Sequence, residues 1–256
     1  MNSSLAMANC HHIRVARWQD GRVYVEDAVA TNRAVSGKEL LDRYMTDLTV
    51  LTLGLVRMRG TSMRVGPVEL LRFGAPRVSK SQVNWPIEGG LAAGAPGGSF
   101  RVRSTEGRLL ATLEGYRPRV PPPVYTAMQL PVHHLLTRLY LMRVRGREPV
   151  PGPTPPEPDR VRSASVDVAM CLTLVRLTGR RRIGRAIVFA AAYHAVCWTV
   201  WGRTLGGVVT RQRVVAVDGS PLTLTQSLLR FALLPLSWIT RQPIHDEIAQ
   251  STVISG

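Results

Sequence analysis

The sequence predicts a two-domain protein: an α+β domain, made of an antiparallel sheet with a long C-terminal helix, followed by an all-α domain of three helices. Two observations lead to this class. Residues 148–159 contain six prolines in twelve positions and no apolar residue larger than valine, which is typical of a linker with polyproline II character. Short alternating segments broken by glycine and proline precede this stretch, and longer apolar segments follow it. We therefore place the two domains at residues 1–147 and 160–256.

Two turn signals predict β-hairpins in the first domain. An Asp-Gly pair and a Glu-Gly pair each separate short segments in which apolar and polar residues alternate, the pattern of paired strands. Asp20-Gly21 lies between residues 12–17 and 22–26, and Glu106-Gly107 lies between residues 100–103 and 109–114. Glycines and prolines are frequent from residue 63 to residue 104, which indicates further short strands joined by loops.

One early helix and one late helix complete the first domain. Ser36 and Glu39 have the spacing of a capping box, which predicts a helix over residues 37–47. Residues 48–59, rich in Leu, Val and Thr, are typical of a buried strand. Apolar residues at helical spacing over 124–145 predict a long amphipathic helix. This order of elements resembles the helix-grip fold of lipid and steroid carriers, and the resemblance implies a domain that binds a ligand or a partner.

Three apolar segments predict the helices of the second domain, at residues 168–175, 186–201 and 222–239. Arg160 and Asp167 stand two helical turns apart and so share one face, and Arg230 lies in the third segment. A buried charge without a partner is costly. We therefore predict that Asp167 is hydrogen-bonded to Arg230 or to Arg160, in a charge cluster that is either functional or a structural lock between helices.

The stretch from Trp201 to Arg230 joins the last two segments. Its glycines at positions 202, 206 and 207 allow tight backbone turns, and residues 211–217 alternate as a short strand. Asp218-Gly219 is a strong turn signal, after which a helix is expected to begin near Leu222.

These residues resemble the RDD family of small membrane proteins. The resemblance depends on a G-R-T-L-G motif, a V-V-x-x-D-G turn, an arginine in the helix that follows and a closing H-D pair. In this sequence those positions are Gly202, Arg203, Thr204, Gly206, Asp218, Gly219, Arg230, His245 and Asp246. Arg160 and Asp167 resemble the family's arginine and aspartate at the first membrane helix. The resemblance implies a membrane-associated second domain at the cytoplasmic membrane and a first domain in the cytoplasm, without a settled activity.

Several functions follow from these observations. The resemblance implies a transport-related or accessory protein, with membrane lipid as partner and a second copy of the chain or another membrane protein as further candidates. A soluble helix-grip carrier or enzyme with a degenerate RDD domain is one alternative, and an arginine-rich RNA-associated protein is another. The apolar segments either span the bilayer with their arginines at its surfaces, lie partly embedded as a helical hairpin, or form a soluble helical domain. At 1.5 Å per residue, the segment 186–201 reaches about 24 Å, against about 30 Å of hydrocarbon.

Composition argues against several functional classes. The net charge is +16 and the pI is about 11.2, which would suit a nucleic-acid partner. The only lysines, however, are Lys38 and Lys80, and GC-rich coding explains this excess of arginine better than selection for phosphate binding does. Nucleic acid is therefore not a favoured partner. Three cysteines without C-x-x-C spacing indicate neither a disulfide framework nor a zinc site. No serine or cysteine lies in a nucleophile motif, and neighbours such as His245 and Asp246 point about 100° apart on a helix. No catalytic residue, metal site or cofactor is therefore predicted.

Overall fold

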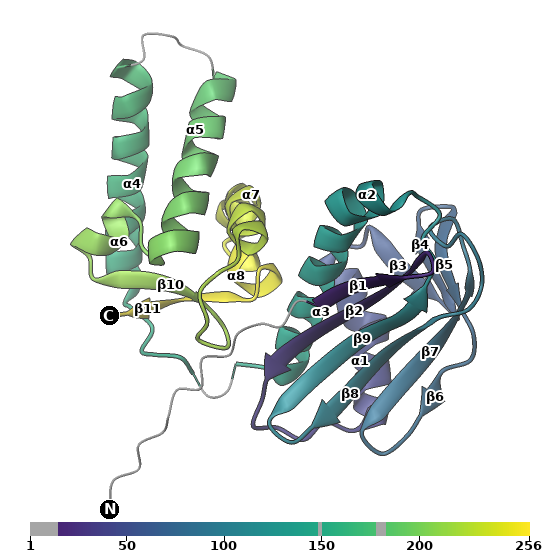
Figure 1. Cartoon of the computed structure of the whole chain (residues 1–256). Helices are drawn as coiled ribbons and strands as arrows, with labels where there is room; N and C mark the ends of the chain where they lie inside the picture. Colours follow the sequence, from purple (N-terminus) through teal and green to yellow (C-terminus); the bar gives the residue numbers. More distant parts are fainter. Residues whose placement is uncertain (1–14, 148–149, 178–182) are drawn as a thin grey trace, which may run out of the picture. The chain divides into compact units, whose positions relative to one another are not determined.

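The computed structural model describes residues 15–147, 150–177 and 183–256 (Figure 1). Contacts within the chain divide it between Arg145 and Gly146 into two compact units, called here the N-terminal unit and the C-terminal unit. Residues 12–14 of the first predicted strand and residues 148–149 of the predicted linker lie outside the described residues. That each of the two predicted domains folds independently stays a prediction.

The N-terminal unit is built on an antiparallel sheet, as the sequence predicts. Its strands follow the order β1-β2-β9-β8-β7-β5-β4-β3, and β6 is added beside β7. Their bounds are β1 Val15–Gln19, β2 Arg22–Ala30, β3 Val56–Arg59, β4 Ser62–Val65, β5 Val68–Phe73, β6 Arg77–Val78, β7 Gln82–Gly89, β8 Ser99–Thr105 and β9 Arg108–Tyr116. Because β9 pairs with β2, the chain returns to its first hairpin before the final helix begins.

Two helices lie behind the sheet in the view of Figure 1, and they cover one face of it. Helix α1 spans Gly37–Leu51 and α3 spans Leu130–Arg145, so the predicted early helix and long final helix are both present. The final helix is preceded by one short turn, α2 (Pro122–Val124), and one π-helical turn, η1 (Tyr125–Gln129). Ser36 caps α1, because its hydroxyl oxygen accepts the Glu39 N–H at 3.2 Å.

The prediction of a strand over residues 48–59 is wrong for the first half of this range. Helix α1 continues to Leu51, and β3 begins only at Val56. Leu48 and Leu51 are buried and extend the inward face of the helix, so their apolar character comes from a helical face and not from a strand. The Thr52 hydroxyl then donates to the Leu48 carbonyl oxygen at 2.8 Å and helps to end the helix.

The core of the N-terminal unit lies between the sheet and these helices. Along β2 the side chains alternate between buried and half-buried, which directs one set of residues toward the helices. Tyr44 of α1 is at the centre, with its ring centroid 4.8 Å from that of Trp85 and 5.2 Å from that of Tyr140. The Tyr140 hydroxyl donates to the Leu40 carbonyl oxygen at 2.8 Å, which satisfies a buried polar group. Aromatic packing thus joins both helices to the sheet.

The C-terminal unit is mainly helical but not all-α. Its helices are α4 Glu157–Leu177, α5 Ile183–Val196, the π-helical turn η2 Cys197–Trp201, α6 Leu205–Val209, α7 Leu224–Thr240 and α8 Ile244–Ile248. Strand β10 (Gln212–Ala216) pairs with β11 (Ser251–Ser255) in an antiparallel sheet, which corrects the all-α prediction. The short strand predicted at 211–217 is thus present. Its partner was not predicted, because Ala216 and its partner Ser251 are 35 positions apart in the sequence.

Part of the predicted linker belongs to the C-terminal unit. Helix α4 begins at Glu157, inside the proline-rich stretch. Before it, the Pro153 carbonyl oxygen accepts the Ser255 N–H at 2.8 Å, and Pro155 is buried. The prolines therefore give way to helix earlier than the composition indicates, since proline is tolerated in the first turn of a helix.

Candidate functional site

Polar side chains from four elements meet around Asp246 in the C-terminal unit. Asp246 lies on α8 and is 5% exposed, and Arg230, on α7, is 3% exposed. The Arg230 guanidinium donates to Asp246 Oδ1 and, at 2.5 Å, to the Ser251 hydroxyl oxygen on β11. Arg160, on α4, donates to Asp246 Oδ2 at 3.1 Å. We call Arg160, Arg230, Asp246 and Ser251 the Asp246 cluster; it connects α4, α7, α8 and β11.

Two aromatic side chains border the Asp246 cluster. The Cζ atom of Arg230 lies 5.1 Å from the centroid of the Trp198 ring, at the distance of a cation–π contact. His245 Nε2 lies 3.4 Å from Asp246 Oδ2, and His245 Nδ1 lies 2.8 Å from Ser237 Oγ. The prediction that His245 and Asp246 point apart is therefore wrong for their end groups. The directions of the Cβ atoms do not fix the imidazole nitrogens, which lie further along the side chain and turn back toward the carboxylate.

The charges of the cluster are set by burial and by the two arginines. Burial alone would raise the pKa of Asp246, but Arg230, His245 and Arg160 hold it below its usual range. The pKa of His245 is lowered to about 4, first by burial and then by Arg230 and Arg160, against the opposing effect of Asp246. At neutral pH a negative carboxylate therefore lies between two guanidinium groups and an uncharged imidazole.

Asp167 is the centre of a second polar cluster. It lies on α4 and is 6% exposed. Its Oδ1 accepts the Tyr193 hydroxyl at 2.9 Å and the Gly206 N–H at 2.9 Å, and its Oδ2 accepts the Thr204 hydroxyl at 2.7 Å. The Tyr193 oxygen in turn accepts the Leu205 N–H at 2.7 Å. This group, the Asp167 cluster, ties α4 to α5 and to the first turn of α6.

The predicted pairing of Asp167 with Arg230 or Arg160 is wrong. Arg160 and Arg230 do come together, but both bind Asp246. Asp167 receives its hydrogen bonds from hydroxyl and backbone groups. Arg160 and Asp167 lie two turns apart on α4, and their side chains contact different elements. Arg160 binds Asp246 on α8, and Asp167 accepts the Gly206 N–H of α6. A shared helical face therefore did not imply a shared partner.

The G-R-T-L-G motif builds the turn that holds Asp167. Gly202 has φ +67 and its carbonyl oxygen accepts the Val214 N–H at 2.7 Å, which begins the turn toward β10. Thr204 caps α6, since its hydroxyl oxygen accepts the Gly207 N–H at 3.2 Å. A Cβ at Gly206 would lie 2.0 Å from the Ser163 carbonyl oxygen, so glycine is needed where α6 approaches α4.

The Asp218-Gly219 turn ends β10. Gly219 has φ +79, and its N–H donates to the Ala216 carbonyl oxygen at 2.8 Å. Asp218 Oδ1 accepts the backbone N–H of Ser220 at 3.0 Å and its hydroxyl at 2.5 Å. This is the arrangement of an aspartate-initiated turn, and it confirms the turn predicted from the sequence.

We expect Gly219→Val to destabilise the C-terminal unit by about 1 to 3 kcal/mol, because a β-branched residue is strained at positive φ. Hydrogen exchange followed by mass spectrometry would measure the loss in peptides of that unit. Gly184→Val is the matched control, since Gly184 has no positive φ and open space around its Cβ position. Equal exchange in the two variants would contradict the role given to the turn.

Several residues in or beside the two clusters were not predicted from the sequence. Tyr193, Trp198, Ser237 and Ser251 carry no charge and belong to no quoted motif. Tyr193 could have been noticed as a polar group inside an apolar segment. Ser251 joins Arg230 only because β11 pairs with β10, and no local pattern indicates that.

The chemistry of these two clusters is that of hydrogen-bonded ion pairs and buried hydroxyl groups. Within the described parts of the chain, no three His, Cys, Asp or Glu side chains are grouped so as to hold a metal ion. Both clusters join helices through polar groups that are largely hydrogen-bonded inside the unit, although the buried Arg230 Nε has no hydrogen-bond partner among the described residues.

The N-terminal unit contains a buried pair of its own. His134 Nδ1 on α3 lies 2.8 Å from Asp27 Oδ1 on β2, and His133 Nε2 lies 3.9 Å from Asp27 Oδ2. Burial lowers the pKa of His133 to about 4, although Asp27 acts in the opposite direction. No local pattern joins a strand aspartate to a helix histidine 107 residues later, so this pair was not predicted.

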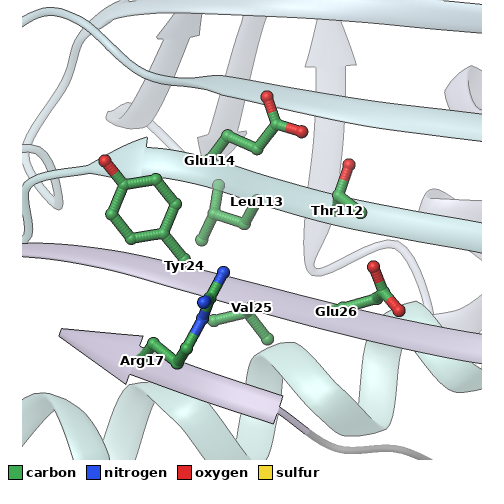
Figure 2. A pocket seen from close by; sticks show the side chains of 7 residues that line it. All are labelled: Arg17, Tyr24, Val25, Glu26, Thr112, Leu113 and Glu114. Atoms are coloured by element: carbon green, nitrogen blue, oxygen red, sulfur yellow. The ribbon is translucent and has the colours of Figure 1, made fainter. Parts of the chain in front are cut away.

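The same unit has an open hollow of about 300 Å³ where β1, β2 and β9 lie side by side. Figure 2 shows the side chains that line it, which are Arg17, Tyr24, Val25, Glu26, Thr112, Leu113 and Glu114. Its rim therefore offers one guanidinium, one phenol, one hydroxyl and two carboxylates. Such a lining suits a small polar ligand or a polar surface of a partner.

The fold defines a protein with an α+β unit and a mainly helical unit. Within the helical unit, arginine–aspartate and aspartate–hydroxyl contacts join the helices to one another. Residues 185–253 match the sequence profile of the RDD family, so the C-terminal part of the chain carries an RDD family region. The match includes the G-R-T-L-G motif, the Asp218-Gly219 turn, Arg230 and Asp246, whereas Arg160 and Asp167 lie before it. The family suggests a membrane-associated protein of unclear function.

No curated protein and no solved structure matches the chain. The analogy of the N-terminal unit with the helix-grip fold therefore stays a prediction.

In the ranges 15–147, 150–177 and 183–256, no helix is both long enough and apolar enough to cross a bilayer. The predicted transmembrane helix is not supported.

Proposed function

We propose that this is a membrane-associated accessory or transport-related protein. In this proposal its C-terminal unit lies partly embedded in the cytoplasmic membrane as a helical hairpin, and its N-terminal unit, in the cytoplasm, binds a ligand or a partner. The observation that carries the membrane part is the reversed polarity of helix α7.

Helix α7 turns polar side chains inward and apolar side chains outward. Its buried residues are Gln226, Ser227, Arg230, Leu233 and Ser237. On the opposite side Leu224 and Leu228 are exposed, Trp238 is 67% exposed and Ile239 is 80% exposed. A surface helix of a water-soluble domain has the opposite arrangement. The outer face of α7 is therefore suited to contact with an apolar phase.

The hairpin of α4 and α5 repeats this pattern. The two helices run side by side in Figure 1 and contact each other. Val188 and Val196 on α5 and Val200 on η2 are exposed at multiples of four residues, which forms one apolar stripe. On α4, Val168 and Leu172 are exposed while Asp167 is buried. Three helices thus present apolar faces to the outside.

The two polar clusters explain how the unit can be built in this way. In an apolar phase every polar group must be satisfied within the protein. The Asp246 cluster and the Asp167 cluster bring the carboxylates, the Arg230 guanidinium and the buried hydroxyls to one another. Polar groups therefore help to hold these helices together from inside, beside buried apolar side chains such as Trp198, Leu233 and Ile254, while further apolar side chains remain on the outer surface.

The energy available from the outer face is sufficient for reversible binding. Removing a Leu or Ile side chain from water contributes about 1.5 to 3 kcal/mol when burial is complete. Leu224, Leu228, Trp238 and Ile239 together would then contribute on the order of 5 kcal/mol in contact with lipid, after allowance for their partial exposure. The RDD family match favours lipid over a second protein as the covering phase.

For the N-terminal unit we propose ligand or partner binding at the hollow between β1, β2 and β9. Arg17 is the cationic group of its lining, while Glu26 and Glu114 are the anionic ones. This arrangement favours a ligand that carries both a hydrogen-bond donor and an acceptor, and not a plain hydrocarbon chain.

The membrane part is tested with the full chain and vesicles of phosphatidylcholine. We expect the wild type to float with the vesicles, and the double variant Leu228→Gln/Ile239→Gln to partition about 10- to 100-fold less, because two exposed apolar side chains lose their contact with lipid. Sucrose-gradient flotation measures the bound fraction.

The matched control is Val78→Gln/Leu91→Gln, which changes two exposed apolar residues of the N-terminal unit. Its flotation should equal that of the wild type. If instead the protein dimerises without vesicles and the α7 variant abolishes the dimer, a second copy covers this face and the proposal fails.

A further inference from the structure

The segment that contains the G-R-T-L-G motif carries exposed apolar residues and arginines together. Trp201 ends η2 and is 67% exposed, and Val208 and Val209 on α6 are also exposed. Arg211 and Arg213 are exposed, and Arg203 is half-buried. Tryptophan beside arginine is typical of the interfacial layer of a membrane, where an apolar ring meets charged headgroups.

The backbone brings the three arginines to one place. The hydrogen bond from Val214 N–H to the Gly202 carbonyl oxygen, 2.7 Å long, puts Arg203 next to Arg213. Gly256 lies beside all three residues: its N–H donates to the Arg211 carbonyl oxygen at 2.9 Å, and a Cβ on it would lie 3.6 Å from Arg213 Cδ and 4.0 Å from Arg203 Nη2. Helix α6, with Val208, contacts β10 directly. The apolar side chains and the guanidinium groups therefore border one another.

These arginines have no carboxylate of their own. Three carboxylates of the C-terminal unit form ion pairs with other arginines: Asp246 with Arg160 and Arg230, Glu247 with Arg147, and Asp159 with Arg162. Asp167 accepts hydroxyl and backbone donors. Within the described residues, no ion pair involves Arg203, Arg211 or Arg213. Three unpaired positive charges thus lie beside an exposed apolar rim.

We infer that Arg203, Arg211 and Arg213 bind the phosphate groups of anionic phospholipids while Trp201, Val208 and Val209 enter the headgroup–acyl boundary. The inference rests on the proposed membrane association and adds to it a lipid class. A guanidinium donates two parallel hydrogen bonds to a phosphate, which makes arginine well suited to this contact. Single-stranded RNA offers the same phosphate chemistry, but the adjoining aliphatic valines favour a bilayer over a base-stacking surface.

The test compares vesicles of phosphatidylcholine alone with vesicles that also contain phosphatidylglycerol, using the full chain. Each arginine at an anionic surface contributes a factor of about five in affinity, so we expect the wild type to bind the anionic vesicles on the order of 100-fold more tightly. In the triple variant Arg203→Gln/Arg211→Gln/Arg213→Gln this preference should disappear, while binding to neutral vesicles stays unchanged. Circular dichroism would verify that the variant is folded.

The matched control is Arg59→Gln/Arg77→Gln/Arg108→Gln, which removes the same charge from exposed arginines of the N-terminal unit. It should keep the preference for anionic vesicles. An equal loss in both triple variants would assign the effect to net charge and overturn the inference. A second outcome would also overturn the inference: the wild type and the Arg203/Arg211/Arg213 variant bind vesicles equally, but only the wild type binds an RNA oligonucleotide. Absence of binding to neutral vesicles would instead contradict the proposed function.

Discussion

Replacing Asp246 with alanine is expected to destabilise the C-terminal unit by about 3 to 5 kcal/mol, because it leaves the buried Arg230 guanidinium without its carboxylate. The same change removes the acceptor of Arg160 and of the Ser251 hydroxyl. Three elements besides α8 therefore lose a contact at once. Hydrogen exchange of peptides from α7 and β11 would measure the loss within that unit.

The neighbouring residue provides the control. Glu247 forms an ion pair with Arg147 in which both side chains are nearly half exposed. Exposed pairs of this kind contribute about 0 to 1 kcal/mol, so Glu247→Ala should have a small effect. A loss in Asp246→Ala no larger than that in Glu247→Ala would show that the Asp246 cluster does not hold the unit together.

A double variant separates the buried charge from the contact. Arg230→Met with Asp246→Leu removes both charges and keeps similar volumes, and such replacements of buried ion pairs are often neutral. Arg160 retains access to water, because its side chain is 36% exposed. We therefore expect most of the stability to return. If the losses of the two single variants simply add in the double variant, the direct pairing of Arg230 with Asp246 is refuted.

The sequence predicted best where a local pattern determines a local structure. The three turn signals at residues 20–21, 106–107 and 218–219 all appear as turns, with the glycine at positive φ in each. The capping box at Ser36 is half correct: its hydroxyl caps the helix, but the Glu39 carboxylate binds Arg33 at 2.7 Å. A side chain at a helix start can find a better partner outside the helix, and the four-residue pattern does not include that partner.

The candidate site was predicted only in part, for a different reason. Arg160, Asp167 and Arg230 were singled out because charges in apolar segments need partners, and all three have partners. Which partner each one takes depends on how α4, α6, α7 and α8 meet. Spacing along one helix gives the face of a side chain but not the element that covers this face. Asp246 was named only as part of a family motif and as a neighbour of His245, and its carboxylate is the acceptor of both arginines.

The reversed polarity of helix α7 connects the fold with the proposed function. Charges and hydroxyls inside the unit cost folding free energy unless every one is satisfied. The inward face of α7 is nevertheless mainly polar and its outward face is apolar, an arrangement that is advantageous when the outward face must contact lipid. Under this view the Asp246 and Asp167 clusters are structural requirements of membrane association.

For the Asp167 cluster we expect Asp167→Ala to cost about 3 kcal/mol, because three donors lose their acceptor in a buried place: the hydroxyls of Tyr193 and Thr204 and the Gly206 N–H. Asp167→Asn should cost about 1 kcal/mol, since its amide oxygen still accepts and the Thr204 hydroxyl can rotate to accept from the amide nitrogen. Chemical denaturation of the full chain, with hydrogen exchange of α6 as the local measure, gives both values.

Asp159→Ala on the same helix is the matched control, because Asp159 pairs with Arg162 at the surface and its removal should cost less than about 1 kcal/mol. If Asp167→Ala loses more stability than Asp167→Asn, hydrogen bonds accepted by residue 167 hold α6 against α4. Equal losses for Ala and Asn would mean that the negative charge itself is needed, and the structural role given to Asp167 would then be wrong. The comparison has a physical basis in the geometry: all three donors are neutral, so a neutral acceptor of the same shape should largely suffice.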